Sequence, residues 1–493
     1  MFEHRSNSKP QTATGVTKRR AVATGPIMVI FLALFALAIP SRGQNFIEVE
    51  AATRPGGGSW KKYPTSTIAQ SPELAALTPD SSLDRYGGNS DHQLRATGFF
   101  YTTNILGRWW FVDPLGHLFI HKGVSTLKPL HTPGSEQTFR TKFGSDANWG
   151  LRVTELLREN GFNGAGAWSS LPDLRVAPEP LVYTRILNFM VAYGRKRGGT
   201  YQQPGHTGFP NDCVFVFDPG FETFCDEYAQ QLAADKDDPY LLGHFSDNEL
   251  PFKHSTLTNY LSLPATDAGH QAAEEWLRSR HGEKATAASI TEQDNRDFLS
   301  LVVARYFRIV SRAIHKYDPN HLFLGSRFYG PDINCPEIFK ASGPYLDVVS
   351  VNYYYVWTPK QSDLAMWSKQ SGRPILITEW YAKGEDSGLP NHNGAGWVVK
   401  TQRDRGLFYQ NFTLGLLSSS VCVGWHWLQY ADNDPADTKT DPSNRDANKG
   451  IVNIRFEPYV PLLEAMKQVN ERSYALAHYF QSSGPDRNRL EQK

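Results

Sequence analysis

The chain has 493 residues, of which 40% are hydrophobic and 13% aromatic, so it has enough apolar side chains for a large packed core. Its 51 basic and 50 acidic residues leave a formal net charge of +1. This balance argues against a nucleic-acid-binding protein, which normally carries a basic excess, and against a protein that holds a strongly charged polymer.

The N-terminal segment is typical of an export signal. A basic stretch that includes 17-TKRR-20 precedes 27-IMVIFLALFALAI-39, thirteen apolar residues without a charge. Because a membrane-spanning helix needs about 20 residues, this run fits a signal peptide better than the alternative, an uncleaved membrane anchor. We therefore expect a signal peptide over 1–43, with small residues at 41-SRG-43 for cleavage, and a secreted or periplasmic protein without stable membrane association.

Residues 44–107 show little periodicity, and we expect a short N-terminal extension there. The pattern then changes, because 108-RWWFVD-113 and 117-HLFIHKGVST-126 alternate like paired strands across the turn 114-PLG-116. Strand-like and helix-like segments alternate from there to about residue 480, and 481–493 is expected to be a tail.

The expected helices show apolar residues at helical spacing, whereas the expected inner strands are continuously apolar. In chain order we expect helices over 149–160, 220–235, 296–317, 336–342, 361–371, 404–420 and 460–480. Strands are expected over 161–168, 181–193, 240–249, 321–328, 345–356, 373–380 and 421–430, with a long loop over 194–212 and a polar, partly helical insertion to about 295.

Counting from His117, the sequence predicts about eight strands, most of which are followed by a helix. Strands that are apolar on both faces are typical of a parallel sheet covered by helices. The sequence therefore predicts an α/β fold, a (β/α)8 TIM barrel over 108–480, with a doubly wound open sheet as the alternative.

Two of the expected strands end on acidic residues. The stretch 240-YLLGHFSDNELPF-252 leads to Asn248 and Glu249, and 374-PILITEW-380 leads to Glu379. In a (β/α)8 barrel the C-terminal ends of the strands form the mouth, where polar residues lie in a cleft. As ends of strands four and seven, the two Glu residues are expected to face one another, and paired carboxylates are what cleavage of a glycosidic bond requires. Asp247 is expected to face away from Glu249 and to make a structural hydrogen bond.

This pattern resembles clan A glycoside hydrolases, in which Asn-Glu ends strand four and Glu ends strand seven. Within the clan, three segments are similar to the β-agarase-like glycoside hydrolases of family 50, namely 107-GRWWFVDPLGHLFIHKGV-124, 243-GHFSDNEL-250 and 378-TEWYAKGEDSGLPNHNGAGW-397. The segments 404-DRGLFYQNFTLGLL-417 and 424-GWHWLQYADND-434 add to the resemblance, which covers most of the chain from about 107 to 480. Family members often carry a sizeable β-rich N-terminal domain, for which the extension here is short.

The resemblance implies a retaining hydrolase of β-linked, agarose-type galactan, a polysaccharide or oligosaccharide substrate. It implies Glu249 as general acid/base, Glu379 as nucleophile and Asn248 as a donor to the sugar 2-hydroxyl. It also implies Tyr353 or Tyr354 as the donor to the nucleophile. Another clan A activity, such as that of a β-galactosidase, and a barrel that binds carbohydrate without cleaving it are the alternatives.

Further residues near the expected strand ends are candidates for sugar contacts. Trp425 and Trp427 share one face of the last strand, and in clan A an aromatic residue there lies under the sugar beside the scissile bond; packing beneath the helices is the alternative. Arg327 is expected to pair with one of the two Glu residues or with a sugar hydroxyl, or to form a surface ion pair. Four more candidates for sugar contacts are expected late in strands one, two and six, namely His121, Asn163, Trp168 and Asn352.

The remaining motifs exclude other chemistry. The four cysteines, Cys213, Cys225, Cys335 and Cys422, form no zinc-like cluster with histidine, and the acidic loop 432-DNDPADTKTD-441 lacks EF-hand spacing. No GxSxG, HExxH, P-loop or post-strand GxGxxG motif is present, which argues against a serine hydrolase, a zinc protease or a nucleotide-binding protein. We therefore expect no metal and no cofactor in the reaction.

Overall fold

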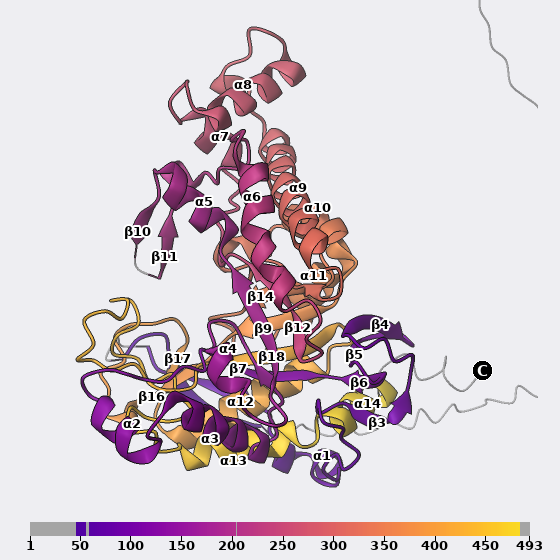
Figure 1. The fold of residues 1–493 in the computed structure, drawn as a ribbon, viewed down its shortest axis with the longest axis vertical. Coiled ribbons are helices and arrows are strands. Elements are labelled where there is room, and N and C mark those ends of the chain that lie inside the picture. The colour runs from indigo at the N-terminus through magenta and orange to yellow at the C-terminus, as the bar shows by residue number, and fades with distance from the viewer. Residues whose placement is uncertain (1–45, 56–58, 204, 484–493) are drawn as a thin grey trace, which may run out of the picture. The chain divides into compact units, whose positions relative to one another are not determined.

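A parallel sheet forms the centre of the computed structural model (Figure 1). It has eight strands in the order β13-β12-β9-β8-β7-β18-β15-β14. The two edge strands meet where Phe328, just after β13, bridges Val351 of β14, so the sheet closes on itself. The barrel strands are β7 (His121–Ser125), β8 (Gly164–Ala165), β9 (Val182–Leu187), β12 (Leu241–Ser246), β13 (Leu322–Phe323), β14 (Val349–Asn352), β15 (Ile375–Glu379) and β18 (Cys422–Leu428). The predicted TIM-like barrel is confirmed, with β12 and β15 as its fourth and seventh strands.

The structure describes residues 46–55, 59–203 and 205–483. The expected signal peptide over 1–43 and most of the expected tail lie outside the described residues. Among the helices that are described, none is both long and apolar enough to cross a membrane.

Helices alternate with the strands along the chain, and those outside the insertion after β12 cover the barrel. The helices are α2 (Glu136–Lys142), α3 (Asp146–Glu159), α4 (Leu171–Leu174), α5 (Phe189–Arg197), α6 (Phe221–Ala229), α7 (Thr256–Leu261), α8 (Ala268–His281), α9 (Glu292–Tyr317), α10 (Pro336–Ser342), α11 (Gln361–Ser371), α12 (Gln402–Leu417), α13 (Val460–Asn470) and α14 (Ser473–Ser483), with the short α1 (Pro72–Ala75) before them. The ranges expected for α10 and α11 coincide with the observed helices.

The insertion after β12 is built on the longest helix. Helix α9 begins at a capping box in which Thr291 and Asp294 satisfy each other's backbone N–H groups. Tyr260 of α7 and Trp276 of α8 both pack edge-on against Phe298, near the start of α9. The polar insertion is therefore largely helical and is held by its own aromatic contacts.

Two expected elements are each divided at a point where a distant carboxylate begins a new helix. The range 181–193 is expected as one strand, but it is β9 followed by α5, whose first N–H groups donate to the carboxylate of Asp247. The range 460–480 is expected as one helix, but it divides into α13 and α14, because Asp80 accepts from the N–H groups of Tyr474 and Ala475.

The expected loop 194–212 contains a hairpin, β10 (Tyr201–Gln203) paired with β11 (His206–Gly208). Two further four-stranded sheets involve the N-terminal extension. One has the order β16 (Ala382–Gly384), β17 (Trp397–Val399), β1 (Ile47–Ala52), β2 (Lys61–Thr65), and the other has the order β3 (Asn89–Gln93), β6 (His117–Phe119), β5 (Arg108–Val112), β4 (Tyr101–Ile105). The antiparallel pairing of β5 with β6 agrees with the hairpin expected around residues 114–116.

The barrel interior is closed by the second of these sheets. Phe111 and Phe119 from β5 and β6 belong to one buried cluster with Leu242, Leu376 and Val423, which lie on barrel strands. Those three residues lie at or near the N-terminal starts of their strands. The sheet therefore fills the N-terminal end of the barrel, and the opposite end is left to form the mouth.

Candidate active site

A cavity of about 830 Å³ opens where the barrel strands end, and the side chains of Glu249 and Glu379 both line it. Asn248, Tyr354 and Trp168 line the same cavity. The ends of the fourth and seventh strands are therefore brought together as the sequence pattern predicts for the C-terminal mouth of such a barrel.

Glu379, the last residue of β15, has a partner for each carboxylate oxygen. Its Oε1 accepts from Arg327 Nη2 at 2.5 Å, and its Oε2 accepts from the hydroxyl of Tyr354 at 2.7 Å. Burial raises the pKa of Glu379, and the nearby carboxylate of Glu249 adds to this, whereas Arg327, Tyr354 and Lys449 act in the opposite direction. These contacts fix the carboxylate in one orientation.

Arg327 is completely buried and lies in the segment that follows β13 (Leu322–Phe323). Besides Glu379 it donates to the carbonyl of Thr378 at 3.1 Å, and its guanidinium lies 4.1 Å from the ring centroid of Trp168. Its Nε and Nη1 have no hydrogen-bond partner among the described residues. Of the arrangements expected for Arg327, the structure contains the buried pair with Glu379 rather than a surface ion pair.

Glu249 has a different environment. Its Oε1 accepts from Asn352 Nδ2 at 2.7 Å, and its Oε2 lies 3.3 Å from Nδ1 of His206 in the hairpin strand β11. The same Asn352 amide also donates to Asn248 Oδ1 at 3.3 Å, while Asn352 Oδ1 accepts from Thr378 at 2.8 Å. Asn352 therefore links the Asn-Glu pair of strand four to strand seven.

Asp247 turns away from the cavity, as expected, and is completely buried. Its carboxylate accepts from the N–H groups of Met190 and Val191 at the start of α5 and from the hydroxyl of Tyr306 on α9 at 2.6 Å. Burial raises the pKa of Asp247 to about 6 despite these three donors. This network fixes the backbone from which Asn248 and Glu249 extend.

Several residues just after barrel strands have left-handed backbone conformations. Such conformations are costly for residues with a Cβ, and they concentrate at functional sites. The residues, with φ between 53° and 60°, are Thr126, Trp168, Asp247, Glu249, Arg327 and Tyr355.

Several residues expected to contact substrate lie outside the cavity. Trp425 donates its Nε1–H to Tyr409 on α12, and Trp427 donates its own to the carbonyl of Lys449, so both indoles face the helix layer and are buried. The reason is strand alternation: His426, between them, is the residue of β18 that faces the barrel interior. These positions correct the expectation that an indole of β18 lies under the sugar.

Tyr353, His121 and Asn163 are also placed away from the mouth. Tyr353 faces outward and donates to Asp363 at 2.6 Å, which leaves Tyr354 as the tyrosine that contacts Glu379. His121 begins β7 instead of ending it, and its Nδ1 lies 2.8 Å from His426 Nε2 in the buried interior. Asn163 precedes β8, and its side chain bonds the backbone of Ile120 and Lys122.

Other residues of the cavity were not expected from the sequence. They include Tyr329, Tyr381, His206, His392, Gln429 and Lys449. Tyr381 follows Glu379 by two residues, so strand alternation indicates it, whereas His206 lies on the hairpin strand β11 and the others lie outside the strands, where the sequence has no periodicity. Lys449 is buried beside Glu379, and burial lowers its pKa to about 8.

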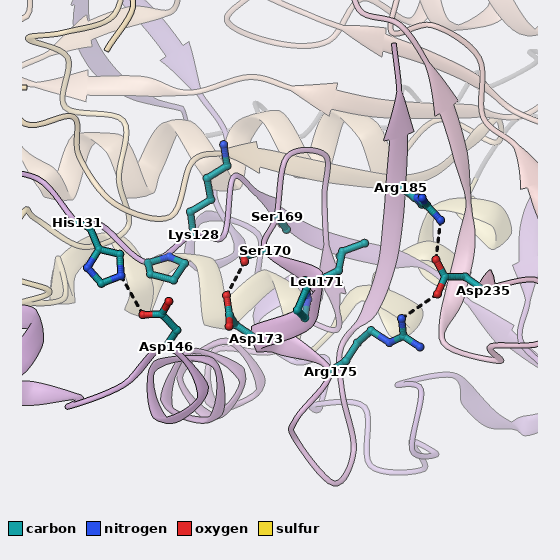
Figure 2. A pocket seen from close by; sticks show the side chains of 12 residues that line it. Lys128, His131, Asp146, Ser169, Ser170, Leu171, Asp173, Arg175, Arg185 and Asp235 are labelled. Carbon is teal, nitrogen blue, oxygen red and sulfur yellow. Dashed lines mark hydrogen bonds and ion pairs between the residues drawn. The ribbon is translucent and has the colours of Figure 1, made fainter. Parts of the chain in front are cut away.

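A second cavity of about 710 Å³ adjoins the first, since Lys128 lines both. Figure 2 shows that most of its charged side chains are already paired: His131 with Asp146, and Arg175 and Arg185 with Asp235. Lys128 extends away from these pairs (Figure 2). Because its carboxylates are occupied by cations or by Ser170, this cavity is less suited to acid/base chemistry than the first.

Comparison with known proteins finds similarity to two proteins named β-agarases. No family model matches the chain. The chain is similar to Beta-agarase B of Vibrio sp. (strain JT0107), with 28% identity over 495 residues that cover 80% of this chain and 50% of that protein. Beta-agarase A of the same strain is 22% identical over 502 residues, covering 81% of this chain and 49% of that protein. The chain thus spans about half the length of the curated relatives it matches.

Solved structures share the fold over a larger part of their length. The crystal structure of BpGH50 superposes with a TM-score of 0.77 and 28% identity, covering 90% of this chain and 98% of that one. The agarase AgWH50C superposes with a TM-score of 0.66 at 23% identity, covering 82% of this chain and 68% of that one, which supports the fold.

Proposed function

We propose that this protein is an exported glycoside hydrolase that cleaves β-linked galactan of the agarose type with retention of configuration. The observation that carries the proposal is the presence of Glu249 and Glu379, at the ends of strands four and seven, in one cavity with different hydrogen-bond partners. Similarity to β-agarases supports the substrate class, and the sequence pattern supports a clan A, family 50 type of enzyme.

In this proposal Glu379 attacks the anomeric carbon and forms a glycosyl-enzyme, because Arg327 and Tyr354 stabilise its ionised form. Glu249 protonates the leaving oxygen and then deprotonates the incoming water. Double displacement of this kind requires the two carboxyl groups to lie about 5–5.5 Å apart.

The other polar residues orient the sugar and the acid/base. Asn352 holds Oε1 of Glu249, so Oε2 is the oxygen available to the leaving group. In this proposal Asn248, which lines the cavity, donates to the sugar 2-hydroxyl, a bond that strengthens in the transition state. Trp168, which stacks on Arg327, offers an aromatic surface in the cavity.

The first experiment measures reducing-sugar release from agarose by the wild type and by Glu379→Gln. The proposal expects release by the wild type and a loss of at least about 1,000-fold in the variant, which lacks the nucleophile. A carbohydrate-binding barrel without activity would release nothing in either case while still binding the polysaccharide.

A second experiment separates the roles of the two carboxylates. In Glu249→Ala, azide is expected to intercept the glycosyl-enzyme and give a β-glycosyl azide. In Glu379→Ala, azide takes the place of the nucleophile and is expected to give the α-glycosyl azide. The reverse pattern of anomers by NMR would exchange the two roles, and an inverted product from the wild type would exclude double displacement.

A further inference from the structure

Three side chains at the opposite end of the barrel form a compact group of potential ligands. Oδ2 of Asp84 lies 2.6 Å from Nδ1 of His117, and Oδ2 of Asp113 lies 3.9 Å from the same nitrogen. One oxygen or nitrogen atom of each residue falls within 4.8 Å of the others. Asp84 lies in the N-terminal extension, whereas Asp113 follows β5 and His117 begins β6, so the group joins two parts of the closing sheet.

The hydrogen bonds around His117 determine which nitrogen faces the carboxylates as an acceptor. Gln93 donates its amide nitrogen to the carbonyls of Leu94 and Leu115, both at 2.9 Å, so its Oε1 is the atom that faces Nε2 of His117 at 3.0 Å. Nε2 must therefore carry a proton. In the neutral imidazole, Nδ1 then has a lone pair directed at Asp84, and that contact is repulsive unless a second proton lies between the two atoms or a cation contacts both of them.

A second proton on His117 does not satisfy the group. It serves Oδ2 of Asp84, but Oδ2 of Asp113 still has no hydrogen-bond partner among the described residues, although its side chain is completely buried. Oδ1 of Asp113 is occupied by the N–H groups of Leu115 and His117.

The backbone also approaches this free oxygen closely. A Cβ built on Gly88 would lie 2.0 Å from Oδ2 of Asp113, so only glycine fits there. The N–H groups of Tyr86 and Gly88 hold Oδ1 of Asp84 at 2.8 and 2.9 Å, which leaves Oδ2 of Asp84 directed toward His117. Each carboxylate is therefore oriented by backbone donors through one oxygen and presents the other to the centre of the group.

We propose that Asp84, Asp113 and His117 bind one divalent transition-metal ion that stabilises the sheet at the N-terminal end of the barrel. Two carboxylate oxygens and one imidazole nitrogen suit Zn²⁺ or Mn²⁺, whereas Ca²⁺ and Mg²⁺ prefer an all-oxygen shell. Gln93 is then the partner that fixes the metal-binding tautomer of the imidazole. Solvent reaches the group, since the side chains of His117 and Asp84 are 13% and 9% exposed, and water can fill the remaining position.

A second group, His244, Asp318 and His321, serves as a comparison. It is completely buried, and both oxygens of Asp318 already accept from imidazole or backbone donors. No carboxylate oxygen in that group is left without a partner, so we assign the metal to the group that contains Asp113.

The test uses the full chain after removal of metal with EDTA, with Zn²⁺ as the probe. Calorimetric titration is expected to show one Zn²⁺ per chain, with affinity at least about tenfold weaker in Asp113→Asn and in His117→Gln. Zn²⁺ in excess should raise the Tm of the wild type by at least about 2 °C, and Ca²⁺ and Mg²⁺ should not. The absorption spectrum of the Co²⁺-substituted protein gives a readout that does not depend on stability.

Asp146→Asn is the matched control, because Asp146 and Glu136 flank the partly exposed His131 in a similar arrangement on the surface. It should bind Zn²⁺ like the wild type. Binding that persists in Asp113→Asn, that is lost in Asp146→Asn or in His321→Gln instead, or that is absent from the wild type would overturn the assignment. Because the group lies away from the mouth, EDTA should leave agarose hydrolysis unchanged at temperatures well below the Tm.

Discussion

Two adjacent tyrosines allow the role of the nucleophile's hydrogen bonds to be tested with a matched control. The hydroxyl of Tyr354 donates to Glu379, and the hydroxyl of Tyr353 donates to Asp363 on the outside of the barrel. Replacement of either by Phe removes one oxygen atom and one hydrogen bond to a carboxylate. Only Tyr354→Phe removes a contact at the proposed reaction centre.

A hydrogen bond to a charged group contributes about 1.5–3 kcal/mol, so Tyr354→Phe is expected to lower kcat/KM by about 10- to 150-fold. Because Tyr354 favours the ionised form of Glu379, its loss should also raise the pKa of Glu379 and move the acidic limb of the kcat/KM profile to higher pH. Tyr353→Phe should leave that profile unchanged and lower stability by about 1–2 kcal/mol. The assay is reducing-sugar release from agarose across pH, with unfolding followed in parallel.

A Tyr354→Phe variant whose kcat/KM stays within twofold of the wild type, with an unshifted acidic limb, would refute the assigned nucleophile environment. Equal losses in both variants would point to a structural effect on strand β14 instead.

The remaining predictions concern two buried cationic residues, Arg327 and Lys449, and the tryptophans Trp425 and Trp168. Arg327→Met leaves the Glu379 carboxylate buried without its cation, and urea unfolding should show a loss of about 3–5 kcal/mol; Arg327→Lys should recover part of it. The pKa of Lys449 is about 8 in the folded protein and 10.5 for an ordinary lysine. Burial of its ammonium group therefore lowers the free energy of unfolding by the full amount below pH 8, and this destabilisation disappears progressively between pH 8 and pH 10.5. Lys449→Met should therefore raise stability at pH 7 by up to about 3 kcal/mol while lowering activity, and an equal gain at pH 10 would contradict this. Trp425→Ala should cost about 3–5 kcal/mol of stability with KM unchanged, whereas Trp168→Ala should raise KM in the same agarose assay.

The barrel could be predicted from the sequence because its strands and helices carry a strong local signal. Continuous apolar runs such as 240–246 and 374–378 are required by burial on both faces, and this pattern is independent of distant residues. Helices α10 and α11 lie where their flanking proline and glycine residues place them. The N-terminal starts of α5 and α14 could not be predicted, because the carboxylates of Asp247 and Asp80, in distant parts of the chain, determine where these helices begin.

Residues of the cavity could be predicted from the sequence only where they lie at the ends of barrel strands. The apolar strands that lead to Glu249 and Glu379 predict that both lie at the mouth, where both line the cavity, but the direction of a side chain near a strand end depends on register. Tyr353 and Tyr354 are adjacent in sequence, yet only Tyr354 faces the cavity. His121 begins strand β7, whereas the sequence predicts it late in that strand. Lys449 comes from a loop, where neither period nor motif indicates a position.

The two carboxylates are held by different means, and this difference favours different roles for them. Glu379 is the last residue of a strand, and its orientation comes from side chains that touch it, Arg327 and Tyr354. Glu249 lies beyond its strand in a left-handed conformation, on a backbone that Asp247 fixes, and its carboxylate contacts the neutral amide of Asn352 and His206 Nδ1 at 3.3 Å instead of a buried arginine. A carboxylate paired with a buried guanidinium is stabilised as an anion, whereas a carboxylate held mainly by a neutral amide exchanges a proton with the substrate more readily. The same contacts that fix the geometry therefore favour Glu379 as nucleophile and Glu249 as acid/base.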